Sequence, residues 1–143
     1  MPTKADAERI ALTLNKMLRE KFDADVVFGG SLGLFLNGIV LDRDFHDVDV
    51  RVLNVDPKVV RKEGVEYEIP IHFLGNTTVP LEYKEVDVQG EKILVYTPET
   101  ILNCKKYTIQ FNETRRIKNE FTERKNEKDR KDLAFIKEKY GIG

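Results

Sequence analysis

The chain has 143 residues and balances 24 basic side chains against 25 acidic ones, for a formal net charge of −1. This length suits one domain, and the 41% hydrophobic content, arranged in regular patterns, argues against disorder. No apolar run reaches membrane-spanning length, and no basic-then-apolar leader opens the chain. The lone cysteine, Cys104, excludes an internal disulfide framework. We therefore expect a cytoplasmic protein without a membrane segment.

The charge is unevenly distributed along the chain. Residues 1–103 carry 12 basic and 18 acidic side chains, a net −6, whereas residues 104–143 carry 12 and 7, a net +5. An acidic part joined to a basic part would suit a polyanionic ligand. The alternative is that most of these lysines and arginines form the solvated face of a helix.

The first half of the chain alternates helical and strand patterns. Thr3 and Asp6 have the spacing of a capping box, and the apolar residues that follow recur at helical intervals. Asp56 followed by Pro57 is typical of a helix start. We expect a helix from Thr3 to about Lys21, a strand at Val26–Phe28, a helix at Leu32–Asn37, a strand at Asp47–Leu53 and a short helix at Lys58–Lys62.

The second half begins with strand patterns and ends with helical ones. Val65–Leu74 alternates imperfectly and contains Pro70, which predicts an edge or interrupted strand. Tyr83–Val88 and Lys92–Tyr96 flank a Gln-Gly turn and predict a β-hairpin. From Thr97 onward the spacing of the apolar residues is helical.

This order of elements predicts an α+β fold, in which a mixed β-sheet is flanked by helices and followed by C-terminal helices. We expect residues 1–143 to form a single domain. Its α/β core would span residues 1–96 and its helical portion residues 97–143.

Two aspartates stand one residue apart in the predicted strand at Asp47–Leu53. Side chains alternate along a strand, so Asp47, Asp49 and Arg51 share one face while the intervening valines share the other. The valines would anchor the strand to a core. The carboxylates would then stand side by side, and a bound divalent cation is the usual reason to tolerate such repulsion. We therefore expect Asp47 and Asp49 to be ligands of Mg²⁺.

A glycine-serine turn, Gly29-Gly30-Ser31, precedes this strand by one short predicted helix. Glycines let backbone N–H groups approach a phosphate closely, and the serine hydroxyl adds a further donor. Either motif alone is weak. Together, with Arg43 between them, they predict a site for a nucleoside triphosphate bound as its magnesium complex. Arg43 itself would meet the triphosphate, or alternatively pair with Asp42 or Asp44 at the surface.

The segment from Gly29 to Asp49, which reads GGS, a helix and then R-x-x-H-D-x-D, resembles the signature of the nucleotidyltransferase superfamily. This superfamily shares its fold with the polymerase-beta catalytic domain. Within it, the segment is most similar to the small antibiotic-modifying and toxin–antitoxin-type members. The resemblance implies Mg²⁺-dependent transfer of a nucleoside monophosphate from a nucleoside triphosphate to a hydroxyl, with release of pyrophosphate.

Later segments share the resemblance. The helix TPETILNCKKY is similar to the family segment in which a lysine faces the nucleotide phosphates, which implies this role for Lys105, or for Lys106. The segment KDRKDLAFI resembles the family's C-terminal K-D-hydrophobic helix. The implied nucleotide-binding residues are Gly29, Gly30, Ser31, Arg43 and Lys105.

One position departs from the family pattern. These enzymes usually carry a third acid on the next core strand, where the antibiotic-modifying relatives read D-x-H and this chain reads Pro70-Ile71-His72. We expect Glu68, rather than Glu66, to replace that acid as catalytic base or metal ligand, because Pro70 can bend the strand. If Glu68 faced solvent and no other acid took its place, a nucleotide-binding module would be the better interpretation.

Three hypotheses follow for the function. The first is a nucleotidyltransferase with Asp47, Asp49 and Glu68 as its catalytic residues and a small molecule, protein or RNA as acceptor. The second is a catalytically weak nucleotide-binding or protein-binding regulatory module, similar to an antitoxin. The third is a plain metal-binding domain, which would leave the glycine-serine turn without a role.

Overall fold

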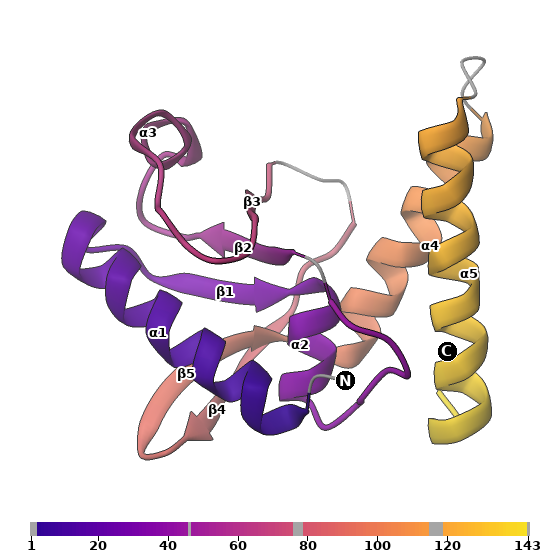
Figure 1. Cartoon of the computed structure of the whole chain (residues 1–143), viewed down its shortest axis with the longest axis horizontal. Helices are drawn as coiled ribbons and strands as arrows, with labels where there is room; N and C mark the ends of the chain where they lie inside the picture. Colours follow the sequence, from indigo (N-terminus) through magenta and orange to yellow (C-terminus); the bar gives the residue numbers. More distant parts are fainter. Residues whose placement is uncertain (1–2, 46, 76–78, 115–118, 143) are drawn as a thin grey trace.

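A computed structural model describes residues 3–45, 47–75, 79–114 and 119–142. His46 of the aspartate motif lies outside these ranges. The fold is α+β, with a mixed sheet, helices packed on it and two long C-terminal helices, as the sequence predicted (Figure 1). The elements are α1 (Lys4–Phe22), β1 (Val26–Gly29), α2 (Gly30–Leu36), β2 (Val48–Val52), α3 (Pro57–Glu63), β3 (Ile71–Phe73), β4 (Tyr83–Val88), β5 (Glu91–Tyr96), α4 (Pro98–Thr114) and α5 (Glu120–Tyr140).

The five strands form one sheet in the order β3-β2-β1-β5-β4. β1 runs antiparallel to β2 and parallel to β5, β3 runs parallel to β2, and β4 and β5 form the predicted hairpin. In this register Gly29 of β1 lies opposite Asp49 of β2, which in turn lies opposite His72 of β3. Residues distant in sequence are thereby aligned in one row across three neighbouring strands.

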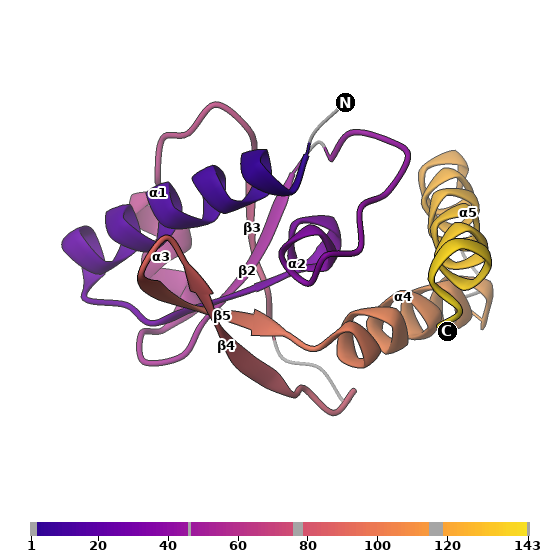
Figure 2. The same cartoon turned by 90° about the horizontal axis from the view of Figure 1, so that it is seen from below.

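The core lies between the sheet and the helices α1 and α2, which contact each other and the sheet (Figure 2). In β2 the three valines Val48, Val50 and Val52 are buried while the residues between them are only half-buried. Phe35 of α2 packs edge-to-face against Phe45, with ring centroids 5.2 Å apart. This contact fixes the segment between α2 and β2, which enters the aspartate motif.

The helices α4 and α5 lie side by side and antiparallel at one end of the sheet (Figures 1 and 2). A buried amide pair joins them, in which Asn112 Nδ2 donates to Asn126 Oδ1 at 3.0 Å. The end of α5 is attached to the segment after α2, because the Val40 N–H donates to the Tyr140 hydroxyl at 2.9 Å. Ile136 of α5 is fully buried. Both ends of the helix pair are therefore held in place.

The strand predicted at Val65–Leu74 is much shorter in the structure, which has a strand only at Ile71–Phe73. Pro70 has no N–H to donate to a neighbouring strand, and its carbonyl accepts the first ladder bond, from Val48 N at 2.9 Å. Pairing therefore begins after the proline, and Glu66 and Glu68 precede the strand. In the part of the chain that the structure covers, no helix is both long enough and apolar enough to cross a membrane.

Candidate functional site

A cleft of about 540 Å³ lies between the ends of the central strands and the helix pair α4–α5. One wall comes from the turn after β1 and from β2 and β3, and includes Gly30, Asp49 and His72. The opposite wall comes from α4 and α5 and includes Lys105 and Lys125. The glycine-serine turn, the aspartate pair and the lysine of α4 therefore meet at a single cavity, although they were identified in separate segments.

The aspartate strand has the alternation expected from its sequence. Asp47, Asp49 and Arg51 all line the cleft, while the valines between them face the core. Burial raises the pKa of the Asp49 carboxyl, and the negative charge of Asp47 raises it further, against the opposing charges of His72, Lys125 and Lys105. His72 Nε2 lies 3.3 Å from Asp47 Oδ2. Asp47 is thus close enough to Asp49 to disfavour the charge of the Asp49 carboxylate.

The aspartate pair fits a magnesium ion that is also bound by phosphate. Mg²⁺ in phosphate-binding sites is often held by one or two carboxylates, with phosphate oxygens and water completing its octahedron. Asp47 and Asp49 supply such a pair, and a cation would relieve the repulsion that raises the pKa of Asp49. Within residues 3–45, 47–75, 79–114 and 119–142, no group of three or more acidic, histidine or cysteine side chains is placed to hold a metal.

Gly30 adjoins the aspartate pair directly. It has a positive φ of 61°, a conformation that L side chains rarely adopt. A Cβ atom at this position would also overlap the Oδ2 atom of Asp49. The position therefore requires glycine for two reasons, its backbone conformation and the space that the Asp49 carboxylate takes up.

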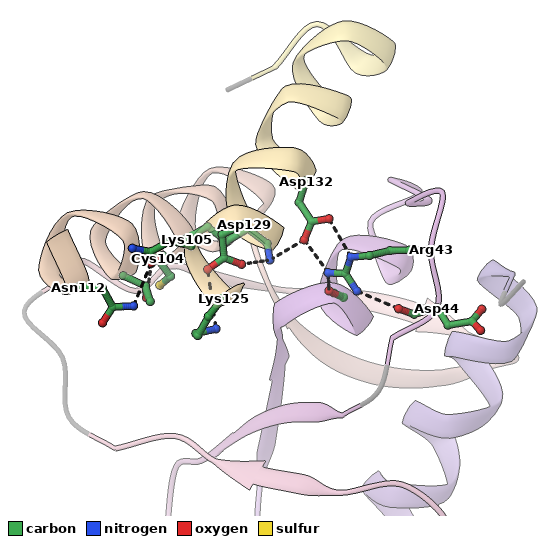
Figure 3. A network of polar contacts seen from close by, with 11 residues as sticks. Arg43, Asp44, Cys104, Lys105, Asn112, Lys125, Asp129 and Asp132 are labelled. Carbon is green, nitrogen blue, oxygen red and sulfur yellow. Dashed lines mark hydrogen bonds and ion pairs between the residues drawn. The ribbon is translucent and has the colours of Figure 1, made fainter. Parts of the chain in front are cut away.

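Arg43 and Ser31 are brought together, but their polar groups are occupied by other parts of the chain (Figure 3). The Arg43 guanidinium donates from Nε to Asp132 Oδ1 at 2.8 Å and from Nη2 to Asp132 Oδ2 at 2.5 Å. It also donates to the Ser31 hydroxyl at 2.9 Å and to the backbone carbonyl of Asp44 at 2.8 Å. The alternative of an ion pair with the Asp42 or Asp44 side chain is not found in the described part of the chain, and Arg43 pairs with Asp132 of α5 instead.

Lys105 belongs to the same network of buried charges, which Figure 3 shows between α4 and α5. Its ammonium lies 3.3 Å from both Asp129 Oδ1 and Asp132 Oδ2, and its side chain is only 11% exposed. Both carboxylate side chains are 3% exposed. We call Arg43, Lys105, Asp129 and Asp132 the charge network. It joins the segment before β2 to α4 and α5.

The pKa of Asp132 results from opposing effects within the charge network. Burial raises it, but the hydrogen bond from Arg43 and the charges of Lys105 and Arg43 lower it by more, so the pKa lies below the usual value. The same hydrogen bond raises the pKa of Arg43. The carboxylate and the guanidinium therefore both stay ionised at neutral pH, as a buried ion pair requires.

The structure does not bring Glu68 to the aspartate pair, which corrects the expectation that it replaces the third acid. Its carboxylate lies 3.6 Å from Arg9 of α1, its side chain is 62% exposed, and it does not line the cleft. The physical reason is Pro70, which delays the strand until Ile71. His72 is the residue of β3 that faces the pair.

Asp129 and Asp132 were missed as site residues by sequence reasoning. The sequence does contain an indication of their role. They fall at the helical spacing of Leu133, Ile136 and Tyr140, at positions where the apolar stripe of the helix should continue. An acid in an apolar stripe needs a cationic partner, and two are found in Lys105 and Arg43. The sequence alone does not say which cations these are.

Comparison with known proteins supports the fold. The sequence matches no protein-family model and no curated protein. Among solved structures, the chain is similar to an antigenic nucleotidyltransferase-like protein from Paracoccidioides brasiliensis, with a TM-score of 0.60 and 15% identity. The match covers 94% of this chain and 76% of that chain. The chain therefore has a nucleotidyltransferase-like fold, in agreement with the resemblance found in its motifs.

Breaking the charge network should destabilise the protein. We expect Asp132→Asn to lower the free energy of unfolding at pH 7 by about 3 kcal/mol, because it removes the carboxylate partner of Arg43 and leaves Lys105 with Asp129 alone. The folded pKa of Asp132 lies below its model value of 3.8. Its stabilising contribution is therefore fully present above pH 3.8 and is lost as the pH falls through the folded pKa.

Urea unfolding of Asp132→Asn and of a matched variant, Glu127→Gln, measures this cost. Glu127 also lies on α5 and pairs with Lys131, but both side chains are more than half exposed, so its replacement should cost at most about 0.5 kcal/mol. Equal unfolding free energies for the two variants would show that the charge network does not stabilise the fold.

Proposed function

We propose that the protein binds a nucleoside triphosphate as its magnesium complex in this cleft. The observation that carries the proposal is the contact between the Asp49 carboxylate and Gly30, with Asp47 beside it at the same cavity. A metal held by the two carboxylates would lie next to the turn whose backbone approaches phosphate most closely. A plain metal site would need the carboxylates but not a cleft of this size beside them.

The cleft has the size and lining that a nucleotide requires. Its volume of about 540 Å³ falls within the range of typical small-ligand pockets. Apolar and aromatic side chains such as Leu74, Ile101 and Tyr107 also line the cleft, and offer a surface for the base and sugar. Lysines of α5 supply positive charge for the phosphates. The nucleotidyltransferase-like neighbour from Paracoccidioides brasiliensis supports the fold on which this proposal rests.

Removing a metal-binding carboxylate should weaken the binding of Mg·ATP and leave the protein folded. We expect Asp49→Asn and Asp47→Asn each to weaken binding of Mg·ATP, measured by calorimetry, by at least tenfold. Because the folded pKa of Asp49 is raised, its ionisation destabilises the folded protein at neutral pH. Asp49→Asn should therefore melt at a slightly higher temperature than the parent at pH 7, and this difference should vanish below pH 3.8.

Asp42→Asn is the matched control for these two variants. Asp42 precedes the same strand and is exposed, and it does not line the cleft. Its replacement should leave Mg·ATP affinity unchanged. If Asp49→Asn and Asp47→Asn bind Mg·ATP as tightly as Asp42→Asn does, the aspartate pair is not the metal site.

The second candidate function is slow transfer of a nucleoside monophosphate to a hydroxyl acceptor. A divalent metal bound at the aspartates would lower the barrier to attack on the α-phosphate by neutralising developing charge. Against efficient transfer stands the position of Glu68, which leaves the aspartate pair without a third carboxylate among the residues that the structure describes. A general base typically contributes 10²–10⁴-fold to a rate, so its loss would slow transfer rather than abolish it. Nucleotide binding is therefore the function that the site supports best.

Incubation with each labelled nucleoside triphosphate and Mg²⁺, with and without candidate small-molecule, protein and RNA acceptors, tests for transfer. Transfer predicts release of pyrophosphate and a label on one acceptor, both absent in Asp49→Asn. Glu68→Gln should transfer at the parental rate, because the Glu68 side chain lies outside the cleft. Mg·ATP binding without pyrophosphate release from any of the four nucleotides would identify a binding module instead.

A further inference from the structure

Among the described residues three lysines line the cleft, and they differ in how far their charge is already neutralised. Lys105 is nearly buried and lies between two carboxylates, Asp129 and Asp132. Lys125 is 43% exposed and makes a single, longer contact with Asp129, at 3.7 Å. Lys128 lines the same cleft and forms no ion pair with any residue that the structure describes. The positive charge available to a ligand therefore increases from Lys105 to Lys128.

Lys125 and Lys128 are placed on one face of α5. They are three positions apart in the helix, so they are neighbours on its surface, together with Phe121 one turn earlier. All three line the cleft, so this face of α5 is turned toward the aspartate pair. The position of that face depends on the charge network, which attaches the next two turns of α5 to Lys105 and Arg43.

Lys128 stands among like charges. Partial enclosure of its ammonium lowers the pKa of Lys128, and the charges of Arg43, Lys125 and Lys105 lower it further, with only Asp129 opposing. Four cations thus gather around two carboxylates, Asp129 and Asp132, which leaves an excess of positive charge on this wall. An anion bound there would relieve the repulsion, as a cation would relieve the repulsion of the aspartates opposite.

We infer that Lys128, assisted by Lys125, is the cation that meets the phosphate chain of the bound nucleotide, and that Lys105 instead positions α5. This inference rests on the proposed nucleotide binding. It gives Lys128 the phosphate-binding role that the family resemblance implies for Lys105. The two walls of the cleft are then complementary. The carboxylates of β2 hold the metal, and the lysines of α5 bind phosphate oxygens as point charges.

Calorimetry with Mg·ATP, Mg·ADP and AMP tests the assignment on the full chain. Lys128→Gln should weaken Mg·ATP binding about tenfold or more, since a hydrogen bond between charged groups is lost, and should change AMP binding little. The ratio of ATP to AMP affinity therefore shrinks. Lys128→Arg should retain most of the parental ratio because it keeps the charge. Lys125→Gln should have a smaller effect than Lys128→Gln, because Asp129 already shares the charge of Lys125.

Lys131→Gln is the matched control, since Lys131 also lies on α5 but is 74% exposed, pairs with Glu127 and does not line the cleft. It should bind all three nucleotides as the parent does. Parental ATP affinity in Lys128→Gln would overturn the inference and leave nucleotide binding standing. A parent protein that binds no Mg·ATP would overturn the proposed function and this inference together. Thermal melts at the parental temperature would show that Lys128→Gln and Lys131→Gln are folded.

Discussion

The buried ion pair between Arg43 and Asp132 is the interaction on which the arrangement of the cleft depends. It joins the segment before the aspartate strand to the last third of the chain, across 89 residues of sequence. Burying two charges is expensive, and only good geometry and further partners compensate for it. Here the guanidinium makes two hydrogen bonds to the carboxylate, and Lys105 lies 3.3 Å from the same carboxylate. An apolar contact could hold α5 as firmly, but it would not fix its register with the same specificity.

The cleft places opposite charges on opposite walls. The wall from β2 carries Asp47 and Asp49, and burial together with the charge of Asp47 raises the pKa of Asp49. The wall from α5 carries Lys125 and Lys128, and partial enclosure together with the charges of neighbouring cations lowers the pKa of Lys128. Like charges thus repel each other on each wall. A ligand that carries both a metal cation and phosphate anions would reduce both repulsions. This is why we favour a magnesium–nucleotide complex over either component alone.

Local pattern was enough to predict most of the fold. The helix at α1, the hairpin and the alternation of β2 follow from capping, turn and periodicity signals that act within a few residues. The site was predicted in part, because the aspartate and glycine-serine motifs adjoin in sequence with one helix between them. Their contact in the structure, Gly30 against Asp49, is the tertiary consequence of pairing β1 with β2.

What the sequence could not supply was the set of partners made by tertiary packing. Glu68 has the expected chemistry, but Pro70 keeps it out of the sheet and Arg9 of α1 is its partner. Lys105 has the expected location in the cleft, but Asp129 and Asp132 neutralise it. For Lys105 the outcome was decided by two side chains more than twenty residues away, whereas for Glu68 it was decided by Pro70, two residues along the chain. Periodicity within one element carries no information about such partners.

Metal and nucleotide should bind together, since the aspartates offer only part of a metal's ligand set. The most direct test is the affinity for a non-hydrolysable ATP analogue, measured with saturating Mn²⁺ and with the metal removed by a chelator. Cooperative binding predicts at least tenfold tighter binding of the analogue with Mn²⁺, and by linkage an equal gain in Mn²⁺ affinity when the analogue is bound. Equal affinity with and without the metal would contradict the claim.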